Sequence, residues 1–165
     1  MDEAIDRSVF RIEKRRAEAI LSLSDGRILA GCFFLGDASG RHMGPERIGD
    51  VLNSKGTLFP FQIGDADGGR SRTALIHRDH VVTVALPENE DALDPAYAMA
   101  QPHAVSLWLS SGHSLNGSIR FNRPPGQDRL SDWAESADRF CYIETEEGVL
   151  LVNVSYVVEI REVES

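Results

Sequence analysis

Residues 19–26 read AILSLSDG, and residues 105–112 read VSLWLSSG. Apolar residues recur at every second position of both stretches, a pattern that places them on one face of a β-strand. A glycine ends each stretch, as expected at a tight hairpin turn, because glycine readily adopts a positive φ angle. A second glycine follows five residues later in both copies, at Gly31 and Gly117. We therefore expect one small β-hairpin unit to occur twice in the chain.

Three further pairs of segments match in the same order along the chain: residues 47–50 with 129–132, residues 59–61 with 140–142, and residues 75–84 with 151–160. The first pair begins a run of apolar residues at i, i+3 and i+4, which predicts a short amphipathic helix in each unit. The residues that mark the repeat are Gly26, Gly31, Arg47, Asp50, Gly112, Gly117, Arg129 and Asp132. An arginine and an aspartate three residues apart on a helix can pair or cap nearby backbone. We expect a structural role for the pairs Arg47/Asp50 and Arg129/Asp132, with ligand binding as the alternative.

The repeats divide the chain into three parts. We expect an N-terminal segment with the first unit at residues 1–86, a linker with a short helix at 87–102, and the second unit at 103–165. The linker opens with an acidic stretch that lacks β-branched residues. Asp94 followed by Pro95 is typical of a helix start. The first unit carries the longer loops, which fits the tolerance of loops for inserted residues.

Residues 23–31, LSDGRILAG, resemble the first signature of the Sm-like family, in which an apolar strand, a turn glycine and a second glycine follow one another. The closing segments resemble the second signature in their apolar spacing, at Ile76, Val81 and Val84 in one copy and at Val152, Val157 and Ile160 in the other. The resemblance implies a mainly β chain with two tandem small Sm-like β-barrels, each with a short helix. Among Sm-like proteins it is similar to poorly characterised bacterial domains, for which it implies no activity.

The residues that contact RNA in Sm-like proteins have no clear counterpart in this chain. Where the family has an aspartate and an asparagine after the second strand, the sequence reads CFFLGD at 32–37 and SIRFNR at 118–123. The Arg-Gly pair of the closing motif is replaced by HR at 77–78 and by NV at 153–154. RNA binding therefore does not carry over from the resemblance, and we do not expect RNA as a partner.

The overall composition favours a globular protein that is not attracted to polyanions. The 165 residues are 42% hydrophobic and carry a net charge of -9, which opposes non-specific binding to phosphate backbones or anionic lipid. The N-terminus opens with acids and lacks a signal-peptide core, and no apolar run is long enough to span a bilayer. We expect a cytoplasmic protein without membrane insertion. Cys32 and Cys141 are the only cysteines, and we expect two reduced thiols in or near a core.

The sequence offers little evidence for a metal site or for catalysis. His77 and His80 lie three residues apart, and on a strand such residues point to opposite faces, so they are not expected to share an ion. Residues 65–69, DADGG, are similar to part of a calcium-binding loop but lack its later glutamate. Neither a nucleophile elbow nor a phosphate-binding glycine loop is present. We therefore expect a non-enzymatic protein with no metal and no cofactor.

Two classes of function remain open. The favoured class is a protein–protein interaction module, an adaptor or assembly subunit, because strand edges are natural sites for another chain to add. Its partner would be another protein or another copy of the chain. The alternative is a nucleic-acid- or nucleotide-binding regulator. It would use one of two basic groups, formed by Arg41, His42 and Arg47 or by Arg70, Arg72 and Arg78.

Overall fold

The computed structural model describes residues 14–41, 44–64, 72–87, 95–122 and 130–164. In chain order its elements are β1 (Arg15–Leu23), β2 (Ile28–Leu35), α1 (Ile48–Asn53), β3 (Leu58–Ile63), β4 (Arg72–His77), η2 (Arg78–His80), β5 (Val81–Ala85), α2 (Pro95–Ala98), β6 (Pro102–Leu109), β7 (Ser114–Arg120), α3 (Leu130–Ser136), β8 (Phe140–Thr145), β9 (Gly148–Asn153), η4 (Val154–Tyr156) and β10 (Val157–Glu162). In these ranges no helix has the length and apolar character needed to cross a membrane. The expectations for His42, Arg70, Arg129, residues 65–69 and the acidic linker stretch lie outside the described residues.

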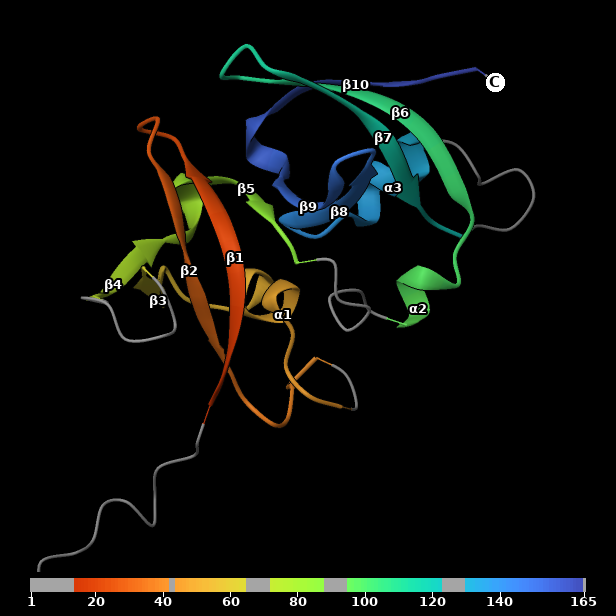
Figure 1. Cartoon of the computed structure of the whole chain (residues 1–165). Helices are drawn as coiled ribbons and strands as arrows, with labels where there is room; N and C mark the ends of the chain where they lie inside the picture. Colours follow the sequence, from red (N-terminus) through yellow and green to blue (C-terminus); the bar gives the residue numbers. More distant parts are fainter. Residues whose placement is uncertain (1–13, 42–43, 65–71, 88–94, 123–129, 165) are drawn as a thin grey trace, which may run out of the picture.

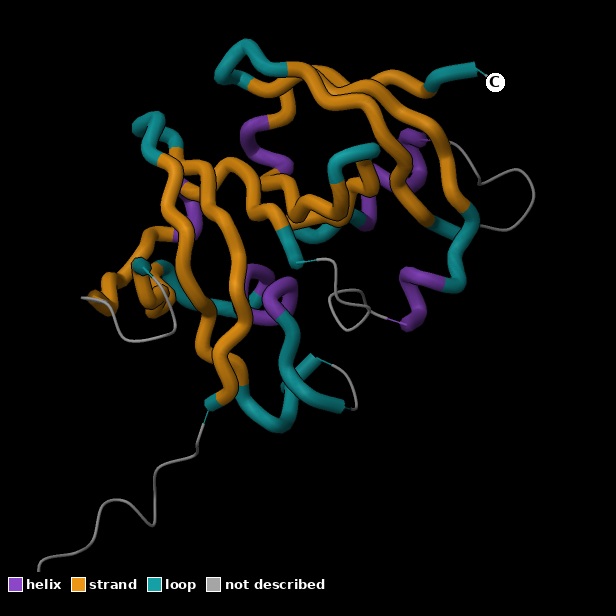
Figure 2. Tube along the Cα trace, in the orientation of Figure 1, coloured by secondary structure: helices purple, strands orange, loops and turns teal. Residues whose placement is uncertain are grey.

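All ten strands form one antiparallel sheet in the order β10-β6-β7-β8-β9-β5-β1-β2-β3-β4 (Figure 1). The mainly β fold class expected from the sequence is therefore confirmed. The sheet consists of two halves with the same internal order, a first half formed by β1 to β5 and a second half formed by β6 to β10 (Figure 2). The halves join where β5 pairs with β9, and Val84 lies opposite Leu151 at this junction.

Each half has a short helix between its second and third strands. In the first half this helix is α1, where Ile48 and Leu52 are buried against the sheet. In the second half it is α3, which begins at Leu130. The helices expected after the two Arg-x-x-Asp segments are thus present at corresponding places. Their amphipathic spacing explains this outcome, because only one stripe of such a helix needs to be buried.

The hairpin turns of the two halves agree in atomic detail. Gly26 has a φ of 91° and Gly112 a φ of 90°, a region that residues with a Cβ rarely adopt. The backbone N–H of Ser24 donates to the carbonyl of His80, and the N–H of Ser110 donates to the carbonyl of Tyr156, both at 2.8 Å. Each turn is therefore tied to the 3-10 turn that precedes the last strand of its own half.

One of the expected sequence matches is wrong by a single residue. Pro60 lies opposite Leu75, and Tyr142 lies opposite Leu151. Since Leu75 corresponds to Leu151, Tyr142 corresponds to Pro60 rather than to Phe61. The aromatic residues of the two segments coincide only in the sequence, because a shift of one residue moves every side chain to the other face of a strand.

Each half has its own hydrophobic core, and each core receives side chains from the other half. The first core contains Phe33, Phe59 and Phe61 together with Phe140 and Leu151 of the second half. The second core contains Val82 of the first half. The β5–β9 junction is therefore a packed interface as well as a backbone ladder.

Candidate functional site

The second glycine of each repeat has a structural role. A Cβ added to Gly31 would lie 1.9 Å from the carbonyl oxygen of Gln62, and one added to Gly117 would lie 2.3 Å from that of Glu144. Both distances are too short for any side chain, since close backbone approach is a site where only glycine fits. These glycines let β2 approach β3, and β7 approach β8, more closely than a residue with a side chain would allow.

The Arg-x-x-Asp segment also has a structural role in the first half. The carboxylate of Asp50 accepts a hydrogen bond of 2.8 Å from the backbone N–H of Arg47, which satisfies a donor at the start of α1. Asp132 occupies the corresponding place in the first turn of α3, whereas Arg129 is outside the described residues. Of the two roles considered for this segment, the structure of α1 shows backbone capping.

The two outer strands of the sheet, β4 and β10, each have a neighbour on one side only among the described strands. The backbone N–H of Arg78 donates to the carbonyl of Thr57 at 2.9 Å, and hydrogen-bonded pairs alternate along an antiparallel ladder. By this alternation, Ile76 and Ala74 bond to β3, and the backbone groups of Leu75 and Thr73 face the unpaired side. The edge of β4 is thus a row of donors and acceptors that another strand can pair with.

An apolar cavity of about 220 Å³ lies beside the unpaired edge of β10 and is partly covered by α3. Residues that line it include Trp133, Ala134, Val157, Val158 and Ile160. The cavity reaches the second core, where Ile119, Cys141 and Ile143 occupy the positions of Phe33, Phe59 and Phe61 of the first core. Smaller side chains at these positions leave space that the phenylalanines fill in the first half.

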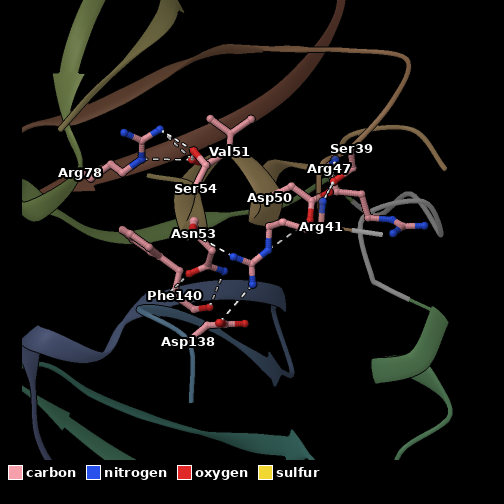
Figure 3. A network of polar contacts seen from close by, with 10 residues as sticks. All are labelled: Ser39, Arg41, Arg47, Asp50, Val51, Asn53, Ser54, Arg78, Asp138 and Phe140. Atoms are coloured by element: carbon pink, nitrogen blue, oxygen red, sulfur yellow. Dashed lines mark hydrogen bonds and ion pairs between the residues drawn. The ribbon is translucent and has the colours of Figure 1, made fainter. Parts of the chain in front are cut away.

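A second cleft, of about 310 Å³, lies between the two halves. The side chains of Arg41, Arg47 and Arg120 line it together with the aromatic rings of Tyr97, Trp133 and Tyr142. Figure 3 shows Arg41 and Asn53 between α1 and the second half, where they reach Asp138 and Phe140. The sequence indicated Arg41 and Arg47 as a basic group, but it did not indicate that Arg120 lies with them.

The side chains of Arg41 and Asn53 connect the two halves at this cleft. Arg41 donates to the carbonyl of Asn53 at 3.0 Å and to the carboxylate of Asp138 at 3.1 Å (Figure 3). The Asn53 amide donates to the carbonyl of Phe140 at 3.1 Å and accepts from its N–H at 2.8 Å. These bonds connect α1 of the first half to the start of β8.

On the opposite wall, Arg120 donates to the carboxylate of Glu144 at 2.7 Å, and this carboxylate raises the pKa of the arginine. Burial, followed by the same carboxylate, raises the pKa of Tyr97. The rings of Tyr97 and Tyr142 lie 4.9 Å apart. The cleft therefore combines an aromatic wall with arginine side chains, two of which are paired with carboxylates.

The second basic group expected from the sequence does not form one exposed surface. Arg78 is buried, and its guanidinium donates to the carbonyl of Val51 at 2.9 and 3.1 Å and to the hydroxyl of Ser54 at 2.9 Å (Figure 3). Burial lowers the pKa of this arginine. Arg78 caps the end of α1, whereas Arg72 is exposed on β4. The sequence does not reveal this difference, because burial depends on how α1 packs.

The argument that His77 and His80 point to opposite faces is wrong. His77 ends β4, but residues 78–80 form a 3-10 turn rather than continuing the strand, and the two rings lie 5.0 Å apart. His77 accepts from the N–H of Asp79, and His80 is hydrogen-bonded to the hydroxyl of Ser24. In the described ranges, no three or more histidine, cysteine, aspartate or glutamate side chains are grouped so that they could hold a metal ion.

Both cysteines are free thiols, and Cys32 is buried. Burial raises the pKa of the Cys32 thiol, and it raises the pKa of Cys141 to about 12. Since only the thiolate is a strong nucleophile, neither residue is activated for chemistry at neutral pH.

Sequence reasoning missed the exposed apolar residues Leu58, Leu75 and Val158. The sequence carries no signal for their exposure, because each of the three corresponds to another apolar residue, and Leu58 is aligned with Phe140 only by the strand register of the structure. Comparison of the chain with protein-family models, with curated proteins and with solved structures finds no match.

Proposed function

We propose that this protein is a non-enzymatic protein–protein interaction module, an adaptor or assembly subunit built from two tandem Sm-like small barrels. The observation that carries the proposal is a difference between two corresponding leucines. Leu151 on β9 is 0% exposed, because β5 pairs with that strand, whereas Leu75 on β4 is 66% exposed. In the second half, β5 covers the edge of β9 and the apolar side chain of Leu151. In the first half, the residues that the structure describes leave the corresponding edge of β4 and the side chain of Leu75 uncovered.

Physical chemistry favours a partner at this edge. An added strand would satisfy the outward backbone groups of β4, and burial of a leucine side chain contributes about 1.5–3 kcal/mol. The net charge of -9 supports a protein rather than a nucleic acid as the partner, since it weakens attraction to phosphates. Strand addition of this kind gives affinity through the main chain and specificity through the side chains.

The variant Thr73→Pro tests strand addition at β4. It removes a backbone N–H that faces the unpaired side, and by the alternation described above it leaves the ladder with β3 intact. Thr73→Val keeps this N–H and is the matched control. Tagged wild-type and variant chains are incubated with an extract of the source cells, and bound proteins, including untagged copies of the chain, are quantified by mass spectrometry.

We expect at least one bound protein that the wild type and Thr73→Val retain and that Thr73→Pro loses by about tenfold, as expected for a lost main-chain contact of about 1.4 kcal/mol. The same set of bound proteins for all three chains would contradict the proposal. Circular dichroism of the purified variants checks that the sheet is retained.

The cleft between the halves favours a second candidate, a nucleotide-binding regulator. Three arginine side chains and an aromatic wall meet there together with the carboxylates of Asp50 and Asp138, and the volume of the cleft is at the lower end of the range for ligand sites. This candidate predicts that a mononucleotide binds in calorimetric titration and that Arg47→Gln weakens it by about tenfold, the loss expected for one charge-assisted hydrogen bond. Binding that is undetectable, or equal in both chains, would leave only the interaction module.

A further inference from the structure

We infer that the apolar cavity beside α3 and β10 is a binding site for a small uncharged aromatic molecule, of a size between benzene and indole. The cavity has a volume of about 220 Å³ and is lined by residues of the second core. The inference does not depend on strand addition at β4, because β4 and β10 are at opposite ends of the sheet. It rests on a comparison with the corresponding place in the first half, which the chain fills with its own side chains.

In the first half, three large side chains fill this place. Leu52 of α1 is 0% exposed, Phe59 of β3 is 1% exposed, and Arg78 is also buried. The ring of Phe59 stacks on that of Phe33 at 5.3 Å, and the Arg78 guanidinium lies over the Phe59 ring at 5.7 Å. The same guanidinium donates to the carbonyl of Val51 and so ties α1 to the end of β4 (Figure 3). The first core is thereby closed beneath its helix.

In the second half, each of these three positions holds a smaller side chain. The replacements are Ala134 for Leu52, Cys141 for Phe59, and Val154 for Arg78. Strand register establishes the second pair, because Phe59 lies opposite Ile76 and Cys141 lies opposite the equivalent Val152. The backbone establishes the third, since the N–H groups of Arg78 and Val154 each donate to the residue that precedes the third strand of their half. All three replacements line the cavity, so it lies where the first half has its closing side chains.

The neighbouring residues of the second half do not refill this space. Ile119 and Ile143 stand where the first core has Phe33 and Phe61, and both line the cavity. Trp133 has a large side chain, but it is only partly buried and forms part of the cavity wall. The volume of the cavity, about 220 Å³, exceeds the roughly 150 Å³ of an engineered apolar cavity that binds benzene. The space is therefore large enough for an aromatic ring.

The lining of the cavity favours an uncharged ligand. Glu159 contributes a carboxylate to the lining, but this group is already paired with Arg161. Burial raises the pKa of the Cys141 thiol to about 12, so this side chain is neutral at physiological pH. A charged ligand would lose its hydration without gaining a partner, whereas an aromatic ring gains contacts with Trp133 and Tyr142. The ligand would occupy the place that a phenylalanine ring occupies in the first core.

The experiment uses two variants of the full chain that refill the cavity with side chains of the first half. Cys141→Phe restores the ring of Phe59, and Ala134→Leu restores the side chain of Leu52 from a different element. Two matched controls leave the cavity open. Cys141→Ala changes the same residue without filling the space, and Ala98→Leu enlarges an exposed alanine of α2 that does not line the cavity. Circular dichroism checks that each variant retains the sheet.

Calorimetric titration with indole, benzene and benzoate measures binding. We expect indole to bind the wild type at a single site with a Kd below about 1 mM. Both refilled variants should weaken indole binding by at least about tenfold, because the ring no longer has room, and both controls should stay within about twofold of the wild type. Benzoate, which adds a charge to the ring of benzene, should bind at least about tenfold more weakly than benzene.

The inference fails if neither indole nor benzene binds the wild type at millimolar concentration, if Ala134→Leu binds indole as the wild type does, or if benzoate binds as tightly as benzene. Because Ala134 does not line the cleft between the halves, its effect assigns the ligand to this cavity. If Cys141→Phe does not fold, Ala134→Leu and its control Ala98→Leu decide the result. Thr73→Pro is expected to bind indole as the wild type does, so a failure here leaves the proposed function unaffected.

Discussion

Two corresponding surfaces, one in each half, differ in burial. They are the outer side of β8 and β9 and the outer side of β3 and β4. Phe140 and Leu151 are buried on the first, whereas Leu58 and Leu75 are exposed on the second. The chemistry of the side chains does not explain this difference, since all four are large and apolar. It arises from position in the sheet, because β9 has β5 as a neighbour and β4 is an outer strand. An exposed apolar side chain in one repeat therefore marks an uncovered surface when its counterpart in the other repeat is buried.

The largest expected effect comes from a charge on the covered surface. Leu151→Asp places a carboxylate in the first core without a partner, and we expect it to lower the free energy of unfolding by more than about 4 kcal/mol. Leu75→Asp makes the same chemical change on the exposed surface and is expected to cost less than about 0.5 kcal/mol in the single chain. Urea denaturation at low protein concentration measures both. Similar losses for the two variants would show that the surfaces do not differ as described.

A smaller effect is expected from the hydrogen bonds that hold the covered surface. Asn53→Ala removes the amide that donates to and accepts from the backbone of Phe140. We expect a loss of about 1–3 kcal/mol in the free energy of unfolding, because a buried backbone group is left unsatisfied. Asn53→Asp keeps the acceptor and loses the donor, so its loss should be intermediate. If Asn53→Ala and the wild type are equally stable, these hydrogen bonds do not stabilise the junction.

A still smaller effect is expected where α1 approaches β8. Gly49→Ala brings a Cβ against the Tyr142 hydroxyl, and we expect a loss of about 1 kcal/mol because the flexible end of the tyrosine can shift. Combining it with Tyr142→Phe, which removes the contacting oxygen, should restore part of this loss. Ser131→Ala, at the corresponding place on the exposed surface, should change the unfolding free energy by less than about 0.5 kcal/mol. Strictly additive effects of the first two substitutions in thermal denaturation would argue against the contact.

The effect that is smallest at neutral pH, and that grows only in alkaline solution, is a pH dependence at the same junction. Burial raises the pKa of Cys141 from 9.0 to about 12, so the folded state favours the neutral thiol more than the unfolded state does. The resulting stability is complete below about pH 9 and is lost as the pH rises toward 12. We expect the stability difference between wild type and Cys141→Ala to decrease over the accessible part of this range, from pH 8 to about 10.5. A difference that is constant with pH in urea denaturation would contradict the raised pKa.

Much of the fold follows from local sequence patterns. Alternating apolar residues and the turn glycines Gly26 and Gly112 predict the hairpins, because strand pleat and positive φ angles are properties of a few consecutive residues. The spacing after Arg47 predicts α1 for the same reason. The order of the matches along the chain indicates that the halves correspond, and the structure has the same strand order in each.

Three features depended on contacts between distant segments and could be seen only in the tertiary structure. The match of residues 59–61 with 140–142 was shifted by one residue, because hydrogen-bonded register rather than residue type sets which side chains face the core. His77 and His80 came together because the chain turns at Arg78, whose guanidinium is anchored on α1. The contrast between Leu75 and Leu151 required the whole sheet, since burial depends on which strand lies alongside and not on the residue itself. The sequence by itself thus determined the repeated unit, whereas the packing of one unit on the other decided which copy of each surface remained open.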